Sequence, residues 1–243
     1  QGGGSSHINA YMVKSAVEIC PEIPYAKGFS STSDSCDFEL ENEALELAKQ
    51  VDSVVVFAGI PDSYESEAFD RKTMAMPPNQ NRLIKRLSLV NPNITVVLHN
   101  GSPVEMPWIH DVSAVLEAYL SGEASHEAVV DILFGKANPC GKLAETFPVN
   151  LSDNPSYYNY HKNNNTAEYR ESIFVGYRHY DNANLNVLFP FGFGLSYTKF
   201  EYKNIEINGK TISFSLKNIG GFDGKEISQI YIAPQINGVF RAE

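Results

Sequence analysis

An acidic segment at residues 65–71, Glu-Ser-Glu-Ala-Phe-Asp-Arg, holds the side chains of this sequence best suited to chemistry. It follows a largely apolar run from Val51 to Gly59, which predicts a buried strand, and it precedes a Pro-Pro break and a helix. Open α/β sheets bind ligands and place catalytic groups just beyond the carboxyl ends of their strands. The segment therefore predicts a functional loop, with the rest of the chain as the scaffold that holds it.

The elements that must position this loop alternate between strands and helices. Apolar runs at 51–59, 93–98 and 114–119 predict buried strands, and amphipathic patterns at 38–50, 80–90 and 125–134 predict helices. A short helix is also expected within 10–19, and Asp37 or Ser35 is expected to cap the helix that starts at residue 38. Strands and helices that alternate in units of ~30 residues indicate an α/β fold with a doubly wound, mainly parallel sheet.

The pattern changes after residue 141. Residues 141–148 are predicted to be extended, 150–166 to form an Asn- and Tyr-rich loop, and 189–198 to form a tight aromatic crossing with two glycines. Alternation of period two at 202–207, 211–216 and 227–232 then predicts three strands, with turns at Asn208-Gly209 and Gly220-Gly221. These strands predict a β-sandwich that is incomplete within this chain.

The composition excludes several classes of protein. The net charge of −10 opposes wholesale binding to nucleic acid or to an anionic membrane. No apolar run approaches the ~18–20 residues that span a bilayer. The three cysteines show no spacing typical of a metal or redox site; Cys20 and Cys36 either pair in an exported protein or stay free thiols. The abrupt Gln-Gly-Gly-Gly start leads us to expect a fragment.

Several ordered sequence blocks resemble those of glycoside hydrolase family 3. Glu-Ala-Phe-Asp-Arg at 67–71, with Met76-Pro77 and Gln80, resembles the family's E-G-x-D-R…L-P…Q stretch. Further blocks that resemble the family are Asn-Gly-Ser-Pro-Val-Glu at 100–105 with Trp108, Gly-Lys-Leu-Ala-Glu-Thr-Phe-Pro at 141–148, Val-Gly-Tyr-Arg-His-Tyr-Asp at 175–181 and Phe-Pro-Phe-Gly-Phe-Gly-Leu-Ser-Tyr-Thr at 189–198. Residues 1–6 resemble the loop after the first strand of the family's second domain.

The resemblance implies two domains and a partner domain. Residues 1–198 would form the family's C-terminal α/β sandwich domain without its first strand, and residues 199–243 would form part of a fibronectin type III-like domain. Family members pair the sandwich with a TIM-like barrel that carries an Asp nucleophile, and this sequence has no counterpart of that barrel. The implied activity is that of a retaining β-glycosidase of the β-glucosidase type, acting on β-linked glucosides or short oligosaccharides. The oligomeric state is left open, and a homodimer is compatible with the sequence.

The resemblance also assigns the acid/base. Retaining hydrolysis uses one carboxyl as nucleophile and a second as acid/base, with the two about 5–5.5 Å apart. Register with Asp70-Arg71 assigns the acid/base to Glu67, while Asp70 and Arg71 are expected to hold the loop through charge-assisted hydrogen bonds. Glu65 is the alternative, because residues two apart in extended structure point to the same side. Ala68 stands where the family has Gly, which weakens the register. The resemblance implies that Ser5 contacts the sugar through its hydroxyl, with packing or stabilisation of a turn as the alternative.

Two other readings of function remain open. The chain would act alone, without activity, as a carbohydrate-binding or structural module, or it would belong to a family member that acts on xylosides, arabinosides or N-acetylglucosaminides. Members that act on N-acetylglucosamine take their acid/base from the barrel, so a well-placed Glu67 argues against that branch. His99, His126 and His179 have no metal-ligand spacing, and we expect no cofactor and no metal.

Overall fold

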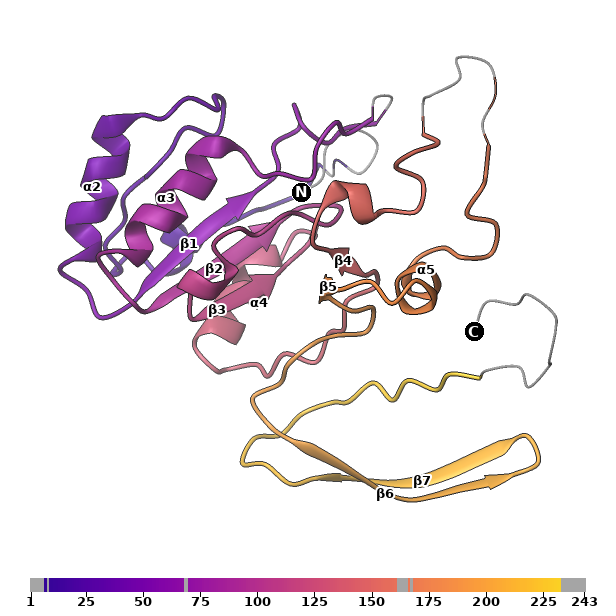
Figure 1. The fold of residues 1–243 in the computed structure, drawn as a ribbon. Helices are drawn as coiled ribbons and strands as arrows, with labels where there is room; N and C mark the ends of the chain where they lie inside the picture. The colour runs from indigo at the N-terminus through magenta and orange to yellow at the C-terminus, as the bar shows by residue number, and fades with distance from the viewer. Residues whose placement is uncertain (1–6, 8, 68–69, 161–165, 167, 233–243) are drawn as a thin grey trace. The chain divides into compact units, whose positions relative to one another are not determined.

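The computed structural model describes residues 7, 9–67, 70–160, 166 and 168–232 (Figure 1). The chain divides into two compact units, Gln1–Val130 and Asp131–Glu243. The domain boundary expected at residue 198 stays a prediction.

A parallel three-stranded sheet forms the centre of the first unit, as expected from the alternation of strands and helices. Its strands are β1 (Val54–Gly59), β2 (Ile94–His99) and β3 (Ala114–Glu117), in the order β1-β2-β3. Gly59 pairs with His99, and Leu98 pairs with Glu117. The carboxyl ends of all three strands therefore meet at one edge of the sheet, where the loops that begin at residues 60, 100 and 118 emerge.

The middle strand, β2, is almost continuously apolar because side chains on both of its faces are buried. Val96, Val97 and Leu98 are all 0% exposed, although successive side chains of a strand point to opposite faces. Both faces of β2 are therefore covered, as in doubly wound folds, whereas β1, predicted to be buried on both faces, leaves Val55 42% exposed. Ile84 and Trp108 are buried in the same core.

The helices of the first unit follow the predicted pattern, although the helix expected at 80–90 starts and ends two residues earlier and the other three are shorter. They are α1 (Ala16–Ile19), α2 (Phe38–Ala48), α3 (Pro78–Ser88), the 3₁₀ turn η2 (Ile109–Asp111) and α4 (Ser125–Leu133), which ends beyond the unit. Asp37 caps α2, because its side chain accepts hydrogen bonds from the first-turn amides. Helices α2 and α3 pack against each other (Figure 1). Among the described residues, no helix has the length and apolar character needed to cross a bilayer.

Gln80 closes the outer edge of β1. Its side chain accepts a hydrogen bond from the Gly59 amide at 2.9 Å and donates one to the Gly59 carbonyl oxygen at 2.9 Å. These are the two bonds that a neighbouring strand would make at this residue. The buried carboxamide therefore fixes the carboxyl end of β1, from which the acidic loop leaves.

The second unit contains two small antiparallel sheets. One pairs β4 (Phe147–Pro148) with β5 (Val187–Phe189), and the other is the hairpin of β6 (Phe200–Asn208) and β7 (Thr211–Asn218). Gly209 has φ +61° at the first loop position of the hairpin, where a tight turn requires a positive φ. The described part of this unit also contains the 3₁₀ turn η3 (Leu151–Asp153) and helix α5 (Tyr177–Asn182). The sequence pattern did not predict α5.

The strand predicted at residues 227–232 is wrong, because this segment has no strand structure. Its contacts run through side chains instead of a backbone ladder: Gln229 donates to the Gly192 carbonyl oxygen at 2.9 Å, and Ser228 shares a 2.9 Å hydrogen bond with Tyr202. A segment with alternating apolar residues forms a strand only where its backbone can hydrogen-bond to the edge of a neighbouring strand. None of the described strands pairs with this segment.

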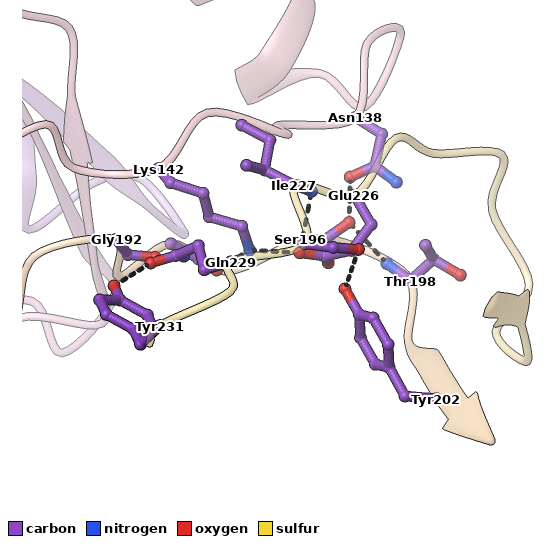
Figure 2. A network of polar contacts seen from close by, with 12 residues as sticks. Asn138, Lys142, Gly192, Ser196, Thr198, Tyr202, Glu226, Ile227, Gln229 and Tyr231 are labelled. Carbon is purple, nitrogen blue, oxygen red and sulfur yellow. Dashed lines mark hydrogen bonds and ion pairs between the residues drawn. The ribbon is translucent and has the colours of Figure 1, made fainter. Parts of the chain in front are cut away.

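A polar network ties this segment to two others in the second unit (Figure 2). Asn138 accepts hydrogen bonds from the Ser196 hydroxyl and the Tyr197 amide, each at 2.9 Å. Lys142 donates to the Gly194 carbonyl oxygen at 2.8 Å and lies 3.3 Å from the Glu226 carboxylate. The network therefore joins residues 138–142, the aromatic crossing at 189–198 and the segment after the hairpin.

Candidate active site

The loops after β1 and β2 meet through Glu65. Its Oε2 atom accepts a hydrogen bond from the Gly101 amide at 2.8 Å, and its Oε1 atom accepts one from the Ser102 hydroxyl at 2.7 Å. A Cβ atom at residue 101 would lie 2.9 Å from Oε1, closer than real Cβ atoms approach a neighbour, so only glycine allows this contact without displacing the carboxylate. Both oxygens of Glu65 are thus engaged in holding the neighbouring loop.

Arg71, at the other end of the acidic loop, binds the same neighbouring loop. One terminal nitrogen donates to the Ser102 hydroxyl oxygen at 2.8 Å and to the Pro103 carbonyl oxygen at 3.0 Å. The other donates to the Met74 carbonyl oxygen at 3.1 Å. Ser102 is therefore shared by both ends of the acidic loop, and we call Glu65, Ser102 and Arg71 the loop clamp.

Glu67 lies between the two ends of the clamp, on the exposed part of the loop. The structure therefore places the predicted acid/base beyond the carboxyl end of β1, where the sequence expected it, although its catalytic role stays a prediction. Asp70 is also exposed. Arg71 holds the loop, and its hydrogen bonds described above run to Ser102, Pro103 and Met74. Ser5, the expected sugar contact, falls outside the described residues.

A second layer of polar contacts supports the clamp. The fully buried Asn100 donates to the Ser102 carbonyl oxygen at 2.9 Å and to Glu117 at 3.3 Å. Glu117, the last residue of β3, also accepts a hydrogen bond from the Tyr119 amide at 2.9 Å. Tyr119 has φ +49°, a conformation that non-glycine residues rarely adopt. The loop after β2 is thereby tied to the end of β3.

Sequence reasoning missed the roles of Ser102 and Asn100. Both belong to the segment at 100–105 that resembles a family block. Asn, Gly, Ser and Pro are typical turn residues, so the sequence alone gave no reason to expect contacts with distant residues. The available signal was topological: polar residues that follow two parallel strands lie at the same edge of the sheet. Applying that rule to Glu65 and Ser102 together would have paired them.

A cluster of two histidines and a phenylalanine lies at the same edge. The His99 ring stacks on Phe57 with ring centroids 6.3 Å apart and lies 5.7 Å from the His126 ring. Burial, and then the neighbouring His126, hold the pKa of His99 below its ordinary value, which a hydrogen bond with the Tyr119 backbone only partly offsets. Within the described ranges no group of three or more His, Cys, Asp or Glu side chains is arranged to hold a metal ion.

The second unit has a small cavity of its own, of about 220 Å³. Aromatic side chains dominate its lining: Tyr177, Tyr180, Phe191 and Tyr231, together with Thr146, Asp181, Val187 and Pro190. Burial, followed by the negative charges of Asp153 and Glu145, raises the pKa of Tyr180 to about 12. None of the residues predicted to act in catalysis lines this cavity.

Comparison with known proteins decides the family. Residues 1–197 match the family model described as the glycosyl hydrolase family 3 C-terminal domain. This chain belongs to glycoside hydrolase family 3. The family 3 chain is 50% identical to thermostable beta-glucosidase B of Acetivibrio thermocellus over 100% of its own length and 34% of that protein. It is 38% identical to an exo-alpha-(1->6)-L-arabinopyranosidase of Bifidobacterium breve, covering 96% of the chain and 32% of the relative.

The solved structures agree with the family assignment. A family 3 beta-glucosidase from Bifidobacterium adolescentis superimposes with a TM-score of 0.85 at 39% identity, covering 89% of this chain and 34% of that one. This likeness confirms the α/β fold expected for the family 3 chain. The chain spans about a third of the length of the curated relatives it matches.

Proposed function

We propose that this chain supplies the general acid/base, Glu67, to a retaining β-glucosidase whose barrel domain and nucleophile lie outside residues 1–243. In the first step Glu67 protonates the glycosidic oxygen of the leaving group while the nucleophile forms the glycosyl-enzyme. In the second step the Glu67 carboxylate takes a proton from the water that hydrolyses this intermediate. The proposed substrates are β-linked glucosides and short oligosaccharides, and a homodimer stays a prediction.

The observation that carries the proposal is the position of Glu67 on a loop whose two ends are held. The loop leaves the carboxyl edge of a parallel sheet, where such folds place reacting groups. Glu65 has both carboxylate oxygens engaged with Gly101 and Ser102. This supports Glu67 rather than Glu65 as the group that faces substrate, in a chain that matches a beta-glucosidase along its whole length.

The test is Glu67→Gln in the full-length protein encoded by the gene that contains these residues. General acid/base catalysis contributes ~10²–10⁴-fold, so kcat/KM for cellobiose should fall by at least about 10²-fold. Azide should restore turnover of activated aryl glucosides, because a small anion can attack the glycosyl-enzyme without a general base. Glu43→Gln, at an exposed position on α2, is the control. Near wild-type turnover would overturn the assignment, and azide rescue of Glu65→Gln instead would transfer the role to Glu65.

A second candidate is α-L-arabinopyranosidase activity. It is favoured by the relative from Bifidobacterium breve, whose name states that activity and which matches 96% of this chain. The full-length protein should be assayed with aryl β-D-glucopyranoside and aryl α-L-arabinopyranoside that carry the same leaving group. A higher kcat/KM for the arabinopyranoside would replace glucose with arabinose as the proposed sugar and leave the role of Glu67 unchanged.

A further inference from the structure

We propose that the loop clamp of Glu65, Ser102 and Arg71 is a positioning device for Glu67, so that Ser102 controls acid catalysis without touching substrate. This inference rests on the proposed function of Glu67. The two ends of the acidic loop meet at a single hydroxyl oxygen, which donates to Glu65 at 2.7 Å and accepts from Arg71 at 2.8 Å. Glu65 and Arg71, which lie on either side of Glu67 in the sequence, are therefore both fixed to Ser102.

The chemistry of the three groups allows only one arrangement of protons. A guanidinium only donates hydrogen bonds, an ionised carboxylate only accepts them, and a hydroxyl does both. Ser102 must therefore accept from Arg71 and donate to Glu65. Both bonds involve a charged partner, and such bonds are about twice as strong as neutral ones. An alanine at residue 102 would break both at once, whereas a threonine would keep the hydroxyl.

The clamp is fixed to the sheet and not only to a second loop. Gly101 donates a further hydrogen bond to Glu65, and the buried Asn100 holds the Ser102 carbonyl oxygen. Asn100 also reaches Glu117 at the end of β3. The base of the acidic loop is thereby tied to the ends of β2 and β3, and Glu67 lies only two residues from the held end at Glu65.

Fixing the loop ends limits the positions open to Glu67, and a displacement of about 1 Å can cost roughly 10²-fold in rate. We therefore expect Ser102→Ala to lower kcat/KM for cellobiose by about 10–10²-fold. The kcat/KM for 2,4-dinitrophenyl β-D-glucoside should stay within about twofold, because this leaving group departs without protonation and kcat/KM reports the first irreversible step. Ser102→Thr should restore most of the activity on cellobiose.

Combining Ser102→Ala with Glu67→Gln distinguishes a positioning effect on Glu67 from general damage to the fold. If Ser102 acts through Glu67, Ser102→Ala should have no further effect on kcat/KM for cellobiose in the Glu67→Gln background. Ser113→Ala removes another serine hydroxyl of the same unit, one that donates to the Pro92 carbonyl oxygen, and should leave all rates unchanged. Where Ser102→Ala prevents folding, Glu65→Gln, which weakens the same clamp, replaces it in each comparison.

Two results would overturn the proposal. An equal loss of kcat/KM on both substrates would show damage to the site as a whole, and an undiminished effect of Ser102→Ala in the Glu67→Gln background would show that Ser102 acts independently of Glu67. The proposed function fails by a different result, because a Glu67→Gln protein with near wild-type activity on cellobiose overturns it whatever Ser102 does.

Discussion

Replacing Glu41 tests the electrostatics that join helices α2 and α3. The Glu41 side chain is 4% exposed, and it accepts hydrogen bonds from Arg82 at 2.8 and 3.3 Å and from Arg86. Removing one partner of a fully buried pair costs ~3–5 kcal/mol, and an exposed pair contributes only ~0–1 kcal/mol. The two arginine side chains are 44% and 37% exposed and stay hydrated, so we expect Glu41→Gln to destabilise the first unit by about 2 kcal/mol.

Trp108 provides a selective assay for this change. It is the only tryptophan in the sequence, and it is buried in the first unit, where its indole nitrogen donates to Asn81. When residues 1–243 are unfolded in urea, its fluorescence therefore reports this unit alone. Glu43→Gln removes a negative charge from an exposed position of the same helix and is the matched control, with an expected change below about 0.5 kcal/mol.

The pH dependence of the stability lost in Glu41→Gln provides the result that could refute this reasoning. Burial alone would raise the pKa of Glu41, but the hydrogen bonds and charges of Arg82 and Arg86 outweigh it and hold the pKa below the ordinary value of 4.5. The unfolded state therefore takes up a proton first as the pH falls, so the stability that Glu41 contributes is complete above pH 4.5 and is lost as the pH falls through the lower folded-state pKa. A Glu41→Gln deficit that equals that of Glu43→Gln, or that does not shrink in acid, would contradict this reasoning.

Three further predictions concern His99, Tyr180 and the Lys142–Glu226 pair. Since the pKa of His99 is lowered, the unfolded state binds a proton first as the pH falls, and the stability of the fold should decrease below about pH 6.5. His99→Asn should reduce this loss of stability, measured by tryptophan fluorescence, whereas His110→Asn, at an exposed position, should not. Since the pKa of Tyr180 is raised to about 12, stability should fall above pH 10, and less so in Tyr180→Phe, as measured by circular dichroism against Tyr169→Phe. Lys142→Met should destabilise the second unit by about 3 kcal/mol because it removes the cation that lies beside the Glu226 carboxylate, and adding Glu226→Gln should recover part of that loss; equal stability of the single and double variants would show that the pair is not coupled.

The core of the first unit could be predicted because its signals are local. The apolar run of β2 indicates a strand covered on both faces, and Asp37 supplies an N-terminal cap immediately before α2. The error at residues 227–232 has the opposite cause. Alternating apolar residues indicate that one face of the segment is apolar, but they do not indicate whether a neighbouring strand is present to pair with it.

The candidate site was predictable in its location and only partly in its detail. Strand ends placed the acidic loop correctly, yet two carboxylates two residues apart could not be told apart by spacing. The contacts of Glu65 come from Ser102 and Gly101, which lie more than thirty residues further along the chain and approach Glu65 because β1 and β2 are parallel neighbours. Contacts of this kind depend on the register of the sheet, which the sequence pattern does not specify in atomic detail.

The network around Lys142 and Asn138 has a consequence for recombination between family members. It joins side chains before residue 143 to Ser196 and Glu226, on either side of the point near residue 198 where the family blocks end. In a hybrid of two parents joined at that point, position 142 would come from one parent and position 226 from the other. Both side chains are 15% exposed or less, so a parent that lacks either charge would leave the other without its partner. Functional hybrids should therefore be recovered more often when residues 138–142 and 222–231 come from the same parent.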